Sequence, residues 1–83
     1  MILHIGCVEF VPLSSIVAVL DVHAHTELME EILSQEGDGA CIQRIGQEEV
    51  KSAILTMSGA RRVFFLSPIS AQTLRKRVES GSA

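Results

Sequence analysis

Five apolar residues stand in an unbroken run at positions 16–20 (IVAVL), and this run constrains the fold of the 83-residue chain more than any other feature. A strand with one side in water alternates polar and apolar residues, so an unbroken run predicts a strand covered on both faces. Residues 63–66 form a second run of this kind. A chain of this length buries only about 60–65 % of its unfolded surface. We therefore expect other copies of the chain to cover part of the apolar surface.

The same apolar content excludes several classes of protein. Apolar residues make up 47 % of the chain, which is the reverse of the composition of a disordered segment. The longest stretch without an ionisable side chain, residues 10–20, is shorter than the roughly 18–20 residues that a membrane-spanning helix needs. The first residues carry no basic segment of the kind that opens an export signal. We therefore expect a cytoplasmic protein with no membrane association.

Turn residues and apolar patterns predict six strands and two helices. Gly6 and Cys7 predict a tight turn between the first two strands, and Pro12 ends the second. Thr26 and Ser70 are the expected N-caps, and the first helix is expected to stop at Gly37. The expected strands cover residues 2–5, 8–11, 16–20, 40–45, 51–57 and 61–66. The order β-β-β-α-β-β-β-α predicts one α+β domain over residues 1–79, with a small, mostly antiparallel sheet, and a flexible tail at 80–83.

Charge is divided unequally between the two halves of the sequence. Residues 1–43 hold seven acidic residues and no lysine or arginine, whereas residues 44–83 hold all seven basic residues and three acids. Five of the seven bases fall into two clusters, Arg61-Arg62 and Arg75-Lys76-Arg77. This asymmetry indicates either an anionic partner for the C-terminal half or attraction between opposite poles of neighbouring subunits.

The two basic clusters are the candidate nucleic-acid-binding residues. Lysine and arginine side chains neutralise phosphates, and they would form one continuous surface if the hairpin and the helix lay on the same edge. The chain has no Trp or Tyr, and its paired phenylalanines, Phe64 and Phe65, lie within an expected strand. Stacking of bases on aromatic side chains is therefore poorly supported, and contact with the backbone of duplex DNA is the expected mode.

Histidine and cysteine patterns do not predict a metal or catalytic site. His23 and His25 could share one face of a strand, but a zinc site needs further ligands, and the nearby candidates are ordinary loop and strand residues. His4 lies on an apolar strand, where a core or interface role is the simpler interpretation. Cys7 and Cys41 form no CxxC pair, and we expect both to be small buried apolar residues. The chain also lacks a nucleophile elbow and a phosphate-binding loop, so we expect no enzyme activity, cofactor or small-molecule substrate.

The sequence resembles the RemA/RemB family of bacterial extracellular matrix regulatory proteins, and the RemB branch most closely. The resemblance rests on residues 4–6 (HIG), 16–21 (IVAVLD), Lys51-Ser52, and the string SPIS-x-x-TL-x-KR at residues 67–77. It implies a small cytosolic regulator that assembles into a ring and contacts DNA around the ring through basic residues. It also implies a fold related to LytTR DNA-binding domains and a role in the regulation of biofilm-matrix genes.

The sequence departs from the RemA branch at the positions that bind DNA in that branch. An arginine pair of the relatives is replaced by the acidic segment at residues 46–50 (GQEEV), where Lys51 is the nearest base, and another of their arginines aligns with Ser15. Two hypotheses therefore stand: a DNA-binding ring, and an interaction ring without nucleic acid. Opposite charges on the two halves favour head-to-tail contact, so under both hypotheses we expect a closed homo-oligomer larger than a tetramer. The candidate DNA-binding residues are Lys51, Arg61, Arg62, Arg75, Lys76 and Arg77.

Overall fold

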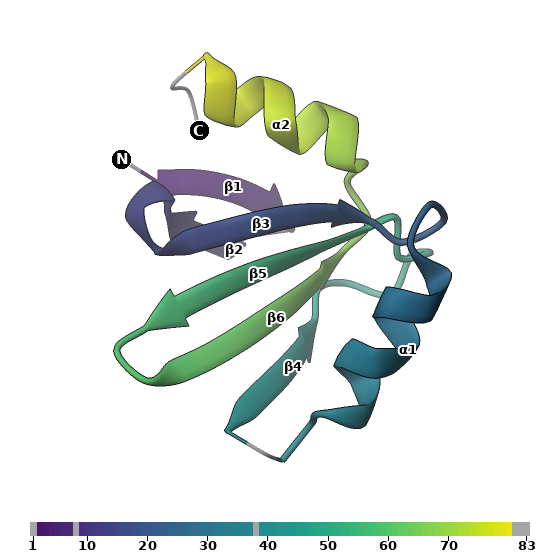
Figure 1. Cartoon of the computed structure of the whole chain (residues 1–83). Helices are drawn as coiled ribbons and strands as arrows, with labels where there is room; N and C mark the ends of the chain where they lie inside the picture. The colour runs from purple at the N-terminus through teal and green to yellow at the C-terminus, as the bar shows by residue number, and fades with distance from the viewer. Residues whose placement is uncertain (1, 8, 38, 81–83) are drawn as a thin grey trace.

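The strands and helices follow the predicted order along the chain (Figure 1). The computed structural model describes residues 2–7, 9–37 and 39–80; Met1, Val8, Asp38 and residues 81–83 of the expected tail lie outside this part. One single-turn 3-10 helix, η1, comes between the second and third strands, after the proline that was predicted to end the second strand. The elements are β1 (Ile2–Gly6), β2 (Glu9–Pro12), η1 (Leu13–Ser15), β3 (Ile16–Asp21), α1 (Thr26–Ser34), β4 (Ala40–Arg44), β5 (Ser52–Ser58), β6 (Arg61–Ser67) and α2 (Ala71–Glu79).

The strands form two sheets rather than one. The first is the antiparallel hairpin β1–β2, and the second has the order β3-β5-β6-β4. In the second sheet β5 is antiparallel to both β3 and β6, whereas β4 runs parallel to β6. The tight turn at Gly59 and Ala60, with Gly59 at a φ of +63°, places β5 beside β6. Because β3 occupies the other edge of β5, β4 pairs with the remaining edge of β6.

The four-stranded sheet separates two apolar cores. Successive strand residues point to opposite faces, so Ala53 and Ile54 of β5 belong to different cores. Helix α1 packs on one face through Met29 and Ile32. The β1–β2 hairpin and α2 pack on the other face, where the buried side chains are Leu3, Ile5, Val11, Ile45, Ile54 and Leu74.

The run at residues 16–20 is less covered than the sequence predicted. No residue of β3 is fully buried, and Val17 is 57 % exposed. β3 lies at the edge of the sheet, and α1 covers only part of the sheet face that it contacts (Figure 1). The expectation of cover on both faces is therefore wrong for the single chain.

The helices begin near the expected positions but differ in detail. Ser70 caps α2 as predicted, because its hydroxyl accepts a hydrogen bond from the N–H of Thr73 at 3.2 Å. The prediction for α1 is wrong: Thr26 is its first residue, and the N-cap, His25, makes no side-chain capping bond. Helix α1 also ends at Ser34, before the expected stop at Gly37.

Neither cysteine is fully buried, contrary to the prediction, and one apolar side chain of α2 is also exposed. Val78 of α2 is four residues after the buried Leu74 but is 38 % exposed, because it faces a groove along the edge strand β3. Cys7 is exposed because it lies in the turn between β1 and β2 at a φ of +48°, and it is a free cysteine. Cys41 is also free and is half-buried in β4.

Candidate nucleic-acid interface

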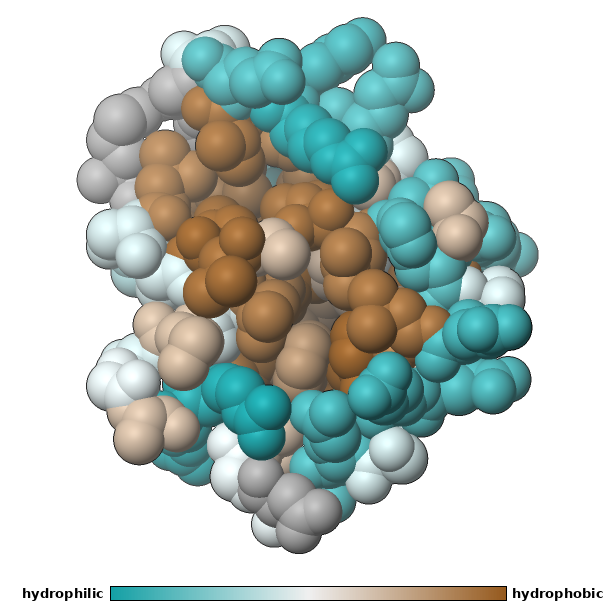
Figure 2. All heavy atoms as spheres, viewed as in Figure 1, coloured by the Kyte–Doolittle hydropathy of each residue, from teal (hydrophilic) through white to brown (hydrophobic). Residues whose placement is uncertain are grey.

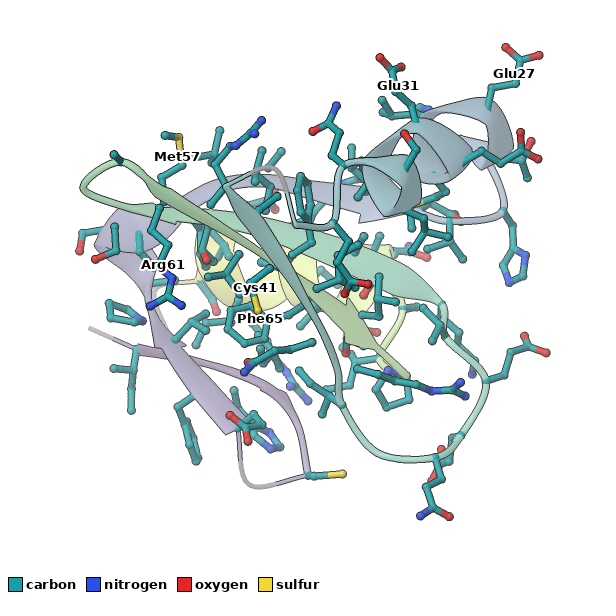
Figure 3. The ribbon with its side chains drawn as sticks, turned by 90° about the horizontal axis from the view of Figure 1, so that it is seen from below. Glu27, Glu31, Cys41, Met57, Arg61 and Phe65 are labelled. Carbon is teal, nitrogen blue, oxygen red and sulfur yellow. The ribbon has the colours of Figure 1, made fainter. Side chains whose placement is uncertain are left out.

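Acidic and basic side chains lie mainly on different helices. Helix α1 exposes Glu27, Glu30 and Glu31, and Figure 3 shows Glu27 and Glu31 pointing away from the sheet. Helix α2 carries the three consecutive bases in its second half. The two helices pack on opposite faces of the four-stranded sheet, so the charge asymmetry of the sequence becomes a separation in space.

Two of the three bases of α2 are anchored to the N-terminal half of the chain. Nη2 of Arg75 donates to the main-chain oxygen of Val19 at 3.0 Å, on the edge strand β3. Nη1 of Arg77 donates to the main-chain oxygen of His4 at 3.0 Å, on β1. Lys76 is exposed between them. The contacts hold the two guanidinium groups in place, while their remaining N–H groups are available for an anion such as phosphate.

The second basic cluster divides between the two faces of the sheet. Arg61 is exposed at the start of β6, and Figure 3 shows it on the side of the β1–β2 hairpin. Arg62 points to the opposite face, where its Nη1 donates to Oε1 of Gln35 at 3.3 Å, just after α1. Arg61 is therefore the member of this pair that lies on the same face of the sheet as α2.

Lys51 lies apart from Arg61. It precedes β5, whereas Arg61 faces the other end of that strand, and seven strand residues span about 20 Å at roughly 3.3 Å per residue. Lys51 lines a depression that it shares with Asp21, His23 and Glu49 and with the start of α2 at Ser70, Ala71 and Gln72. The carboxylates of Asp21 and Glu49 make the surroundings of Lys51 less favourable for phosphate than those of Lys76.

The acidic segment before β5 is exposed and held by local contacts. Glu48 and Glu49 are both exposed. The main-chain oxygen of Glu48 accepts a hydrogen bond from Nη2 of Arg44 at 3.1 Å, and the Glu49 carboxylate lies 3.5 Å from Nε2 of His23. The structure thus places two carboxylates on the surface just before β5.

The histidines take part in local contacts. Nε2 of His4 lies 2.7 Å from the main-chain oxygen of Cys7, and the His4 imidazole centroid lies 5.0 Å from that of the Phe10 phenyl group. His25 is the N-cap of α1. Within residues 2–7, 9–37 and 39–80, no group of three or more His, Cys, Asp or Glu side chains could hold a metal ion. In that same part of the chain, no helix has the length and apolar character needed to cross a membrane.

An apolar surface that sequence reasoning missed lies on the α1 face of the sheet. Figure 2 shows apolar side chains gathered across the middle of this face, with hydrophilic side chains around them. Leu28 and Leu33 of α1 and Met57 of β5 are each between 39 % and 49 % exposed. A groove of about 340 Å³ lies between α1 and strands β3, β5 and β6. The apolar runs indicated excess apolar surface, but which part stays uncovered depends on where α1 packs.

Comparison with known proteins identifies a family but no individual relative. No protein of curated function and no solved structure matches the chain. The model of one family, described as extracellular matrix regulatory protein A-like, matches residues 2–78. This match covers both sheets and nearly all of α2, including the segment in which the acidic residues stand. The chain therefore belongs to the RemA-like family of extracellular matrix regulatory proteins.

Proposed function

We propose that this chain is a non-enzymatic regulator that assembles into a closed ring larger than a tetramer and contacts the backbone of duplex DNA. Membership of a family of extracellular matrix regulatory proteins supports the regulatory role. The observation that carries the DNA contact is the arrangement on α2, where Lys76 is exposed between two anchored arginines. Ordered guanidinium groups lose little side-chain freedom when they meet a phosphate.

The DNA-contacting surface consists of Arg75, Lys76 and Arg77, with Arg61 as a further contact. Repetition of this surface around a ring multiplies weak phosphate contacts, because each later contact forms at a high effective concentration. The contacts carry no base readout, so binding is weakly selective for sequence and depends steeply on salt. Lys51 and Arg62, which were also predicted to bind DNA, have a smaller share, because carboxylates lie beside Lys51 and Arg62 points to the opposite face of the sheet.

The two lysines of the chain allow a matched experiment. Lys76→Glu and Lys51→Glu make the same change of charge at two exposed positions, one on α2 and one before β5. Binding to a fluorescent duplex of arbitrary sequence is measured by anisotropy over a salt series. We expect Lys76→Glu to weaken binding at every sequence and to reduce the slope of log affinity against log salt by about 1 for each subunit in contact.

Two results of this experiment would contradict the proposed DNA contact. Equal weakening by Lys51→Glu would move the contact away from α2, and an unchanged affinity of Lys76→Glu would exclude this surface. Circular dichroism and light scattering of both variants separate a loss of DNA contact from a loss of fold or assembly.

A ring without nucleic-acid activity is the second candidate function, and the exposed Glu48 and Glu49 favour it. Carboxylates repel phosphate at the surface that is basic in the RemA branch. If the wild-type protein forms a ring but binds no duplex even at low salt, this second function replaces the first.

A further inference from the structure

The outward face of the β1–β2 hairpin is an exposed apolar ridge. Leu3, Ile5 and Val11 point into the core and are almost completely buried. The hairpin register pairs Ile2 with Pro12 and His4 with Phe10, so these four side chains share the opposite, outward face. Ile2 is 48 % exposed and Phe10 is 51 % exposed.

The groove on the α1 face is the apolar counterpart of this ridge. Ala18, Leu20, Leu55 and Phe64 line its sheet side, and Leu28 lines its helix side. Its volume of about 340 Å³ is large enough for an aromatic side chain and a neighbouring aliphatic one. Ala18, Leu20 and Leu55 are half-buried and Leu28 is 39 % exposed, whereas Phe64 is buried. Figure 2 shows apolar side chains on the surface across the middle of this face.

The ridge and the groove lie on opposite faces of the four-stranded sheet. Figure 3 shows α1 and Met57 on one side of the sheet and the β1–β2 hairpin on the other. A two-fold contact buries the same surface of both partners, so it would cover the ridge or the groove but not both. A head-to-tail contact covers both surfaces at once, and repeated contacts of this kind close into a ring when the rotation allows it.

Charged side chains around the two surfaces are complementary. The groove includes Glu31 and Arg62 in its lining. At the ridge, Glu9 is exposed at the start of β2. Glu9 at the ridge is opposite in charge to Arg62 in the groove lining, which also donates to Gln35. Such pairs at a rim contribute little affinity but orient the partner.

We propose that the β1–β2 ridge of one copy packs into the groove of the next copy, with Phe10 as the anchor residue. This inference rests on the ring assembly proposed above and names the two surfaces that form it. The occupant is a second copy because the chain itself supplies an apolar ridge and an apolar groove on opposite faces. Apolar burial at the centre of the contact supplies most of its affinity.

Single substitutions on either surface test the contact. Phe10→Ser changes the ridge, Leu28→Ser changes the groove, and Leu33→Ser is the matched control on α1, because Leu33 is also exposed but does not line the groove. Light scattering over a concentration series gives the size of each species. We expect Phe10→Ser and Leu28→Ser each to weaken the contact by about 30-fold or more, and Leu33→Ser to keep the wild-type size.

Mixing the two variants distinguishes the head-to-tail contact from a two-fold contact. Phe10→Ser retains an intact groove and Leu28→Ser retains an intact ridge, so an equimolar mixture can form one good contact and should give a heterodimer. A mixture that stays monomeric would overturn the proposal, as would variants that keep the wild-type size or a Leu33→Ser control that dissociates equally. A wild-type ring that survives both substitutions overturns only this interface, whereas a monomeric wild type overturns the ring as well.

Discussion

Ser67 connects the end of β6 with β1, and its replacement by alanine tests how the β1–β2 hairpin is held to the sheet. The Ser67 side chain is fully buried at the end of β6. Its hydroxyl donates to the main-chain oxygen of Ile5 and accepts from the N–H of Ile69 at 3.0 Å. The hydroxyl of Ser52, also fully buried, donates to the main-chain oxygen of Ile69 at 2.7 Å. Two serines therefore fasten both β1 and the segment before α2.

Ser67→Ala removes the partner of two main-chain groups. A buried polar group that loses its partner costs about 1–3 kcal/mol. The bond to Ile69 is only partly buried, so water can replace part of it, and alanine has no hydroxyl to desolvate. We therefore expect the free energy of unfolding to fall by about 2–3 kcal/mol, which is a large fraction of the roughly 5–15 kcal/mol of a typical domain.

Urea unfolding followed by far-ultraviolet circular dichroism measures this loss in a chain without Trp or Tyr. The wild type, Ser67→Ala and the control Ser58→Ala are compared at equal protein concentration, because the stability of an oligomer depends on concentration. Ser58 is exposed at the end of β5, so its replacement should change stability by no more than about 0.5 kcal/mol. A Ser67→Ala loss no larger than that of the control would refute the reasoning.

Three further predictions concern the turns, metal and salt. Gly6→Ala should destabilise the protein by about 1–3 kcal/mol, and more than Gly59→Ala, in thermal unfolding. Gly6 has a φ of +133° and a Cβ there would lie 3.1 Å from Cγ2 of Ile45, whereas a Cβ at Gly59 would meet open space. Equimolar zinc should leave the unfolding midpoint unchanged, and stoichiometric zinc in the purified protein by elemental analysis would contradict the interpretation of His23 and His25 as loop residues. Raising the salt concentration to roughly 1 M should leave the oligomer size measured by light scattering unchanged, because salt screens ion pairs but does not weaken apolar contacts. Dissociation at that salt concentration would show that charge pairs hold the assembly.

Local patterns in the sequence were sufficient to predict the elements of the fold. A turn at Gly6 and a cap at Ser70 depend on residues within a few positions of each other, so the first hairpin and the start of α2 were predicted correctly. The charge asymmetry is also a property of the sequence, and it becomes spatial because α1 and α2 are separate elements. The family resemblance also rested on short local strings of residues, and the match of the family model to residues 2–78 confirms it.

Tertiary structure decided which of these residues act together. Pairing of β4 with β6 depends on the competition between strand edges, which no local pattern encodes. The anchoring of Arg75 by Val19 joins residues 56 positions apart, and the separation of Lys51 from Arg61 follows from the length of β5. The ridge at Phe10 and the groove beside α1 likewise exist only after the sheet has been assembled. Apolar runs in the sequence predict that surface must be covered, but the packing of the helices determines which surface remains for a partner.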